Sequence, residues 1–242
     1  MVMSIRRLFL SFSLIFFLGA SCRSEKTVEI KKPPPTVIAK PKLALLTAEQ
    51  RSELAFPEEL IAKIELDAGA EAEPFFVTVL MHTENLKGEK GFEIKKLAGL
   101  SVHTRKADEL IDSNRSWLRK RGFLIFKSQR GYGRLQDVVA VARGNNSYDI
   151  LKVQGTEAPY CKLDTKSIIS WLKARQQEGS FVVTGAGTDW IETRFIKPPR
   201  NMRAFAAQVA AFASDVLGQE PSDVKKLAER MNQDNGFYMD WD

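Results

Sequence analysis

The sequence predicts an α+β fold of two layers, a mostly antiparallel sheet with amphipathic helices packed on one side of it. Short β-rich runs follow one another across tight turns, which implies antiparallel pairing. Four later segments carry apolar residues at spacings of three and four, as helices that pack on a sheet do. The order helix, strand, strand also occurs twice, from Ala107 and again from Asp164. Helices and strands therefore belong to one layered domain.

The sequence predicts a strand at Phe75–Met81, which is a continuous apolar run rich in β-formers. Leu60–Leu66 before it fits either a strand or a helix, and Gly91–Val102 predicts one or two further strands around Gly99. A helix over Ala107–Arg121 has its acidic residues near the start and its basic residues at the end, as the helix dipole favours.

Three strands are predicted next, at Phe123–Lys127, Asp137–Arg143 and Tyr148–Gln154. Asp164 is a predicted N-cap for a helix that reaches Gln177. The remaining predicted elements are strands at Phe181–Gly185 and Trp190–Phe195, a helix after Asn201, a helix capped by Ser222, and a terminal strand at Gly236–Asp242. In that last strand Phe237, Met239 and Trp241 alternate with polar neighbours, which predicts one buried face.

The N-terminus has the pattern of a secretory signal. Arg6 and Arg7 precede an apolar run from Leu8 to Leu18, and small residues follow it. The run is about half the ~20 residues that span a bilayer. Leu18-Gly19-Ala20-Ser21-Cys22 resembles a bacterial lipobox, although leucine stands one residue further from the cysteine than in the commonest form. The resemblance implies acylation of Cys22; the alternative is an ordinary signal cut after Ala20 or Ser21.

These patterns divide the chain into three parts. Residues 1–21 are the expected signal peptide, 22–42 the acylated cysteine with a tether rich in lysine and proline, and 43–242 one globular domain. Proline fixes φ and favours extended geometry, so the tether is a semi-rigid spacer. We expect the protein at the bacterial cell envelope, held to a membrane surface by its lipid.

Charge and cysteine content limit the classes of ligand and the kinds of site to be expected in this protein. Residues 84–134 hold many more basic than acidic residues, which suits an anionic glycan or lipid, whereas export argues against nucleic acid. The only cysteines are Cys22 and Cys161, and the only histidines are His82 and His103. A disulfide framework, a metal site and a cofactor are therefore not expected.

Several C-terminal motifs resemble a bacterial family known only as domain of unknown function 4253. They are Tyr148-Asp149-Ile150-Leu151, Ile168–Lys173, Gly185–Glu192, Phe212 with Asp215-Val216, and the terminal Trp241-Asp242. The resemblance spans 97–242 and is weaker before residue 143. Ala213-Ser214 stand where the family usually has Cys-Pro, and Asp240 stands where it has a tryptophan. The resemblance implies the fold and extent of a domain but no activity.

Candidate site residues come from the same region. Gly185-Ala186-Gly187 follows a strand, but another strand comes next, so hairpin glycines with positive φ are preferred to a phosphate loop. Asp189, Glu192 and Asp242 are the carboxylates that could serve acid–base catalysis. Trp190, Tyr238 and Trp241 could form an aromatic ligand platform, with core packing as the alternative.

Three functions remain open from the sequence. The preferred one is a non-catalytic, lipid-anchored envelope protein that binds a partner protein. The second is an envelope hydrolase that uses Asp189 and Glu192. The third is a structural lipoprotein that recognises an anionic glycan through residues 84–134.

Overall fold

The computed structural model describes residues 45–81, 92–213 and 224–241. All of them belong to a compact unit, Lys42–Asp242, that is separate from Met1–Pro41. The predictions about the signal, the acylated Cys22, the tether, the Ser222 cap and Asp242 lie outside the described residues. Among the helices that are described, none has the length and apolar character needed to cross a bilayer.

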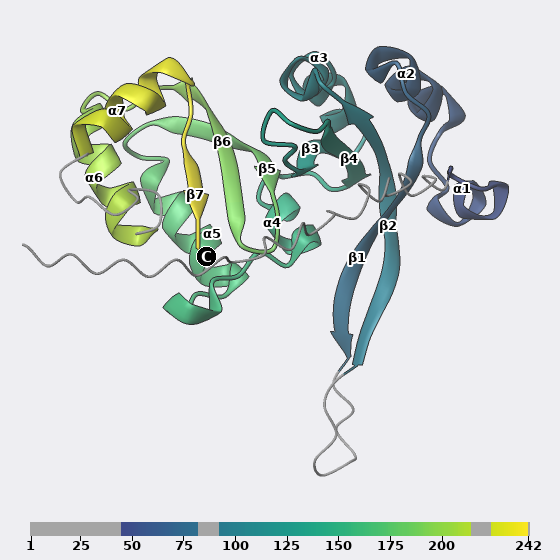
Figure 1. Ribbon diagram of the computed structural model, residues 1–242, viewed down its shortest axis with the longest axis horizontal. Coiled ribbons are helices and arrows are strands. Elements are labelled where there is room, and N and C mark those ends of the chain that lie inside the picture. The colour runs from purple at the N-terminus through teal and green to yellow at the C-terminus, as the bar shows by residue number, and fades with distance from the viewer. Residues whose placement is uncertain (1–44, 82–91, 214–223, 242) are drawn as a thin grey trace, which may run out of the picture. The chain divides into compact units, whose positions relative to one another are not determined.

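The described strands form one seven-stranded sheet in the order β1-β2-β4-β3-β5-β6-β7. Their bounds are β1 Glu73–Met81, β2 Phe92–Thr104, β3 Phe123–Gln129, β4 Asp137–Arg143, β5 Ser180–Ala186, β6 Trp190–Lys197 and β7 Tyr238–Asp240. Every neighbouring pair is antiparallel except β3 and β5, which pair in parallel at Lys127 and Gly185. The predicted α+β fold with a mostly antiparallel sheet is confirmed (Figure 1).

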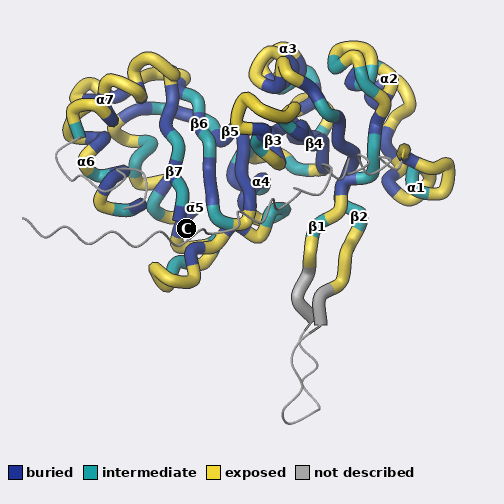
Figure 2. The backbone as a smooth tube through the Cα atoms, in the orientation of Figure 1, coloured by how far each residue is buried: buried dark blue, intermediate teal, exposed yellow. Residues whose placement is uncertain are grey.

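Helices pack on both faces of this sheet rather than on one. Their bounds are α1 Ala48–Leu54, α2 Glu58–Ala68, α3 Ala107–Arg119, α4 Asp149–Gln154, α5 Thr165–Arg175, α6 Met202–Phe212 and α7 Val224–Gln233, with a 3-10 turn at Pro159–Cys161. Apolar residues of α1, α2 and α3 form one core with β2, β3 and β4, and those of α4 to α7 form a second. Side chains of β3 and β4 contribute to both cores. In β3, for example, Ile125 lies in the first core and Phe126 in the second. Figure 2 shows β3 and β4 buried between the helices.

One predicted element has the wrong type. Residues 148–154 were expected as a strand and form helix α4 instead. The Asp149 carboxylate accepts hydrogen bonds from the backbone N–H groups of Asn145 and Asn146, and Gly155 ends the helix at φ 62°. The turn held by Asp149 before the helix and the glycine at its C-terminus therefore define a segment whose short apolar run has no clear period. The ambiguous Leu60–Leu66 is helical within α2.

The other predicted elements within the described residues agree with the structure to within a few residues, whereas helix α1 was not predicted. The side chains of Asp164 and Asn201 cap α5 and α6 by accepting N–H bonds from Ser167 and Ala204. β2 is one continuous strand across the segment expected to hold one or two. In the terminal strand Phe237, Met239 and Trp241 are buried, whereas Tyr238 and Asp240 are half-buried. The chain therefore ends as an edge strand with one face in the second core.

Candidate binding site on the polar face of the sheet

A buried lysine organises the face of β3, β6 and β7 that lies away from α6 and α7. Lys127 follows four buried apolar residues in β3, and only 6 % of its side chain is exposed. Its Nζ lies 3.0 Å from Glu192 Oε1, 3.3 Å from Asp108 Oδ1 and 3.8 Å from Asp137 Oδ2. Burial alone would lower the pKa of Lys127, but these carboxylates outweigh burial and raise it. Lys127 is therefore a charged group that ties four elements together.

Arg130 continues the network toward solvent. Its Nε lies 3.7 Å from Glu192 Oε2, so Glu192 faces two cations. The Arg130 guanidinium also lies 4.2 Å from the ring centre of Tyr238 and 5.3 Å from that of Tyr132. Such cation–π contacts stabilise by about 0.5–1 kcal/mol when exposed. Arg130 therefore joins the buried charges to an exposed aromatic ring.

Tyr238 on β7 closes the network at the edge of the sheet. Its hydroxyl donates a 2.7 Å hydrogen bond to Asp240 Oδ2. Burial, followed by this bond to a carboxylate, raises the pKa of Tyr238 far above its usual value. The phenol is therefore held neutral, as a hydrogen-bond donor rather than a base.

A hollow of about 350 Å³ lies above these groups, lined by Lys127, Arg130, Glu192 and Tyr238 together with Asp108 and Arg194. Arg194 does not pair with Glu192. It lies 2.7 Å from Asp112 Oδ2 and 3.4 Å from Asp108 Oδ1, which joins β6 to α3. Because its charges already pair with one another, the floor of this hollow is a rigid polar surface.

The structure brings only some of the predicted site residues together. Trp190 and Tyr238 are neighbours, with ring centres 6.1 Å apart, and Glu192 pairs with Tyr238 across β6 and β7. Asp189 lies in the preceding turn, where its Oδ1 accepts a 3.4 Å bond from Thr188. Trp241 lies on the opposite face, in the second core, where its Nε1 donates to the carbonyl of Phe212. Asp242 lies outside the described residues.

The two glycines of Gly185-Ala186-Gly187 have a different role from the expected one. Neither has a positive φ. Instead, a Cβ on Gly185 would lie 3.0 Å from the Lys127 Cβ, and a Cβ on Gly187 would overlap the Trp190 indole. The motif therefore makes room for Trp190 and the β3 backbone, and β6 follows it directly.

The loop between β3 and β4, which starts at Arg130, exposes two large apolar side chains. Tyr132 is 69 % exposed and Leu135 is 74 % exposed, and Tyr132 has the left-handed φ of 49°. The loop is held by hydrogen bonds: Gly131 N donates to Asp137 Oδ1 at 2.7 Å, and Leu135 N donates to the Gly131 carbonyl. An ordered loop with exposed aromatic and aliphatic groups is typical of a contact surface.

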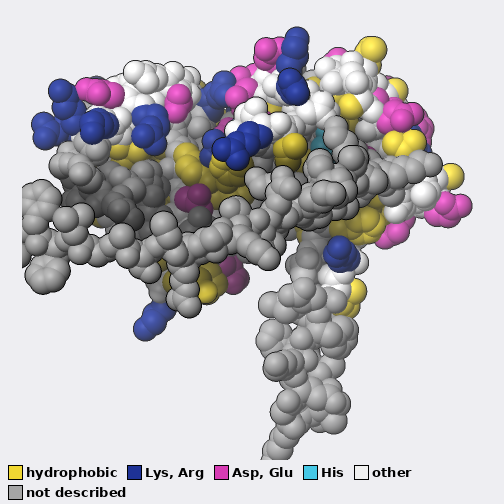
Figure 3. Space-filling model, in the orientation of Figure 1, with side chains coloured by type: hydrophobic (Ala, Val, Ile, Leu, Met, Phe, Trp, Pro, Cys, Tyr) yellow, Lys and Arg dark blue, Asp and Glu magenta, His cyan; other side chains and the backbone are white. Residues whose placement is uncertain are grey.

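The basic residues of 84–134 do not form a single surface in the structure. Lys127 is buried, and Arg115 pairs with Asp112 at 3.2 Å. On the face shown in Figure 3, basic and acidic side chains are interspersed. Arg119 and Lys120, with Arg115, line a groove of about 450 Å³ between α3 and the β5–β6 pair, and no acidic residue lines it. Residues 84–91 lie outside the described residues.

Metal-ligating side chains are scattered. His103 Nε2 lies 3.4 Å from Glu73 Oε2, and Cys161 is an exposed free thiol. Within the described ranges, no group of three or more His, Cys, Asp and Glu side chains is placed to hold a metal ion.

One family model matches the C-terminal part of this chain. Residues 138–242 match the family model described as Domain of unknown function (DUF4253), which confirms the resemblance over those residues. The match contains Glu192, Trp190 and Tyr238 but not Lys127, Arg130 or Tyr132. No curated protein and no solved structure matches the chain.

Proposed function

We propose that this protein is exported, is anchored to the bacterial envelope through acylated Cys22, and binds a partner protein without catalysing a reaction. The support for the anchor is the order of a cationic start, a short apolar run, small residues and a cysteine. The lysine- and proline-rich stretch after Cys22 supports a tether that holds the domain away from the membrane.

The observation that favours binding over catalysis is the position of Glu192. A general acid or base needs a free lone pair or proton directed at the substrate. Both Glu192 oxygens instead face Lys127 and Arg130, while Asp189 interacts in the turn. The exposed Tyr132 beside Arg130 supplies the type of side chain that anchors protein interfaces, and Leu135 adds exposed apolar surface in the same loop.

The anchor is tested by comparing the full-length protein with Cys22→Ala after expression in bacteria. We expect the unaltered protein to partition into the detergent phase with added acyl mass on its N-terminus. The Cys22→Ala variant should lack that mass. Unaltered protein that begins after residue 20 or 21 without acyl mass would contradict the proposal.

Partner binding is tested on the same anchored protein by crosslinking in intact cells, followed by identification of the crosslinked protein. Tyr132→Ala with Leu135→Ala should abolish the crosslink, while Tyr160→Ala serves as control because Tyr160 is also exposed and lies in another loop. If Asp189→Ala with Glu192→Gln leaves the fold intact but removes an envelope phenotype that the loop variant retains, the hydrolase becomes the better proposal.

The groove lined by Arg119 and Lys120 supports a second candidate function, recognition of an anionic glycan. No hydrogen bond or ion pair involves these two side chains among the described residues, so their charge is available. Binding of an acidic polysaccharide should weaken steeply with salt and be lost in Arg119→Ala with Lys120→Ala. Salt-independent binding would exclude this candidate.

A further inference from the structure

A further hollow lies away from the polar face, beside the β1–β2 pair. It measures about 650 Å³ and is lined by residues of α1, β1, β2, β4 and α4. Val77, Ala98 and Val153 form part of its floor and are only partly buried against the second core. The hollow exists because small side chains, Ala98 and Ala142, stand where α4 no longer covers the sheet. Its apolar floor and volume are typical of a small-molecule site.

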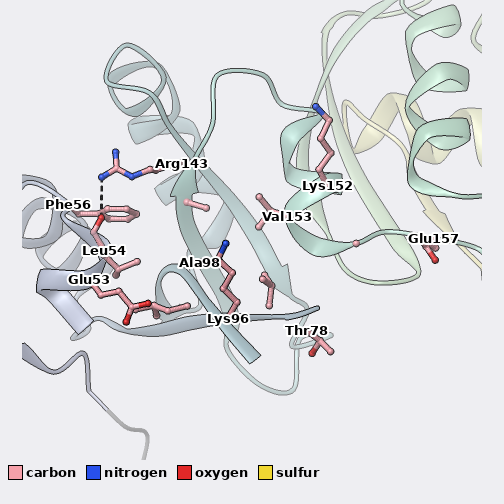
Figure 4. Close-up of a pocket in the computed structure, with 14 residues that line it drawn as sticks. Glu53, Leu54, Phe56, Thr78, Lys96, Ala98, Arg143, Lys152, Val153 and Glu157 are labelled. Carbon is pink, nitrogen blue, oxygen red and sulfur yellow. Dashed lines mark hydrogen bonds between the residues drawn. The ribbon is translucent and has the colours of Figure 1, made fainter. Parts of the chain in front are cut away.

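One cation faces this apolar floor, and a second borders the hollow. In Figure 4 the Lys96 side chain extends from β2 into the space between Phe56 and Val153. Among the described residues, Lys96 has no hydrogen bond or ion pair. Arg143 borders the hollow on the face of the first core, where its Nη2 donates to the carbonyls of Leu54 and Ala55 at 3.1 and 2.9 Å. The guanidinium also lies over the rings of Phe56 and Phe123, which belong to that core and hold it in place.

The remaining charges limit what can bind. Lys152 is already paired with Asp149 at 2.8 Å, so Lys96 is the cation available beside the apolar floor among the described residues. Glu53 and Glu157 lie toward opposite ends of the hollow (Figure 4) and have no ion-pair partner among the described residues. A second anionic group on a ligand would approach one of these carboxylates and be repelled.

We propose that this hollow binds a small amphipathic monocarboxylate. Its carboxylate contacts Lys96 Nζ, and its apolar body covers Val77, Ala98 and Val153. The apolar body removes the exposed part of the floor from water, and the carboxylate gives Lys96 the counter-charge that it lacks. This site is distinct from the polar face and does not depend on the lipid anchor.

The proposal is tested on the Lys42–Asp242 unit, because both cores are built from residues within it. Octanoate is the probe, followed by calorimetry and by chemical-shift changes in the amides of β2 and α4. We expect a Kd of about 1 mM or tighter. Acetate lacks the apolar body, octanamide lacks the charge, and octanedioate adds a second charge. Each should bind at least about tenfold more weakly. Acetate loses the apolar burial, octanamide loses the charge-assisted hydrogen bond, and octanedioate brings its second charge toward Glu53 or Glu157.

Neighbouring lysines on β2 give a matched control. Lys95 and Lys96 are both exposed, but side chains alternate along a strand and only Lys96 lines the hollow. Lys96→Ala should weaken octanoate roughly tenfold, whereas Lys95→Ala should leave it within about twofold. Ala98→Phe should block binding, with circular dichroism confirming that each variant folds.

Three results would overturn the proposal. They are no octanoate binding up to about 20 mM, equal binding of octanamide, or equal effects of Lys95→Ala and Lys96→Ala. None of these results bears on acylation of Cys22, so this site and the proposed anchor fail separately.

Discussion

The two faces of β6 and β7 bury their side chains by opposite means. On the face toward α6 and α7, aromatic rings pack edge to face: the Phe205 and Phe237 ring centres are 5.3 Å apart, and those of Phe181 and Phe237 are 4.9 Å apart. On the other face Glu192 and Tyr238 meet Lys127 and Arg130. Apolar burial stabilises through removal of surface from water, whereas buried charges repay their desolvation only when paired. The aromatic face therefore supplies stability, and the polar face supplies specific geometry.

The largest expected effect lies on the aromatic face. Phe205 is fully buried and contacts three other aromatic rings. Phe205→Ala should lower the free energy of unfolding of the Lys42–Asp242 unit by about 3–5 kcal/mol, measured by urea titration. Leu66→Ala, at a helix position that is 81 % exposed, is the control and should change it by less than about 0.5 kcal/mol. Equal losses would mean that this face does not carry the stability.

The next effect concerns the buried charge. Lys127→Ala leaves Glu192 without its nearest cation and should cost about 3 kcal/mol in unfolding free energy. Replacing both partners, Lys127→Met with Glu192→Leu, should recover part of that loss, because the two most buried charges are removed together. Asp137 and Arg130 also lose a partner, but both keep contact with water. If the double variant is less stable than Lys127→Ala, the polar face contributes stability beyond its pairing, and the contrast between the faces is smaller than stated.

Ionisation of groups on the polar face should also lower the free energy of unfolding at alkaline pH. Tyr238 has a raised pKa in the folded protein, while an unfolded tyrosine ionises near pH ~10. The stabilisation that follows from this difference in pKa is fully present below that pH. As the pH rises further, the free energy of unfolding falls by up to about 1.4 kcal/mol per pH unit. The raised pKa of Lys127 acts in the same direction and range. Urea midpoints between pH 9 and 11 should therefore fall less in Tyr238→Phe than in the unaltered protein; an identical fall would remove Tyr238 as the cause.

The smallest change in unfolding free energy is expected for Tyr132, where a substitution should affect partner binding but not stability. Tyr132→Gly relieves a left-handed backbone, which favours folding by about 1 kcal/mol, but loses the Arg130 contact and adds backbone entropy to the unfolded chain. The net change in unfolding free energy should stay within about 0.5 kcal/mol, while crosslinking to the partner is lost. A variant that unfolds readily would show that Tyr132 is structural.

The sequence predicted the strands and long helices well where capping and period agree, as at Asp164 and Asn201. It misassigned 148–154 because the helix starts from a turn at Asn145 and Asn146 that is held by the Asp149 carboxylate, and that turn cannot be recognised from residue types alone. It also gave no reason to place helices on both faces, since Ile125 and Phe126 are equally apolar and only their alternation separates the cores.

The candidate site was harder to predict than the fold. Glu192 and Tyr238 were chosen as residue types, but their partners Lys127 and Arg130 are about 60–110 residues away in the chain, and pairing over that distance follows from the sheet order. One signal was present. Lys127 ends the apolar run Phe123–Phe126, and a lysine that continues a fully buried strand requires a carboxylate partner.

The strand order has a consequence for where this domain can be cut. The family match begins at residue 138, within β4, yet β3 lies between β4 and β5 in the sheet. A fragment that starts at the family boundary would contain two separated pieces of sheet with a missing strand between them. The autonomous folding module is therefore larger than the recognised family segment and must include at least Phe123–Gln129.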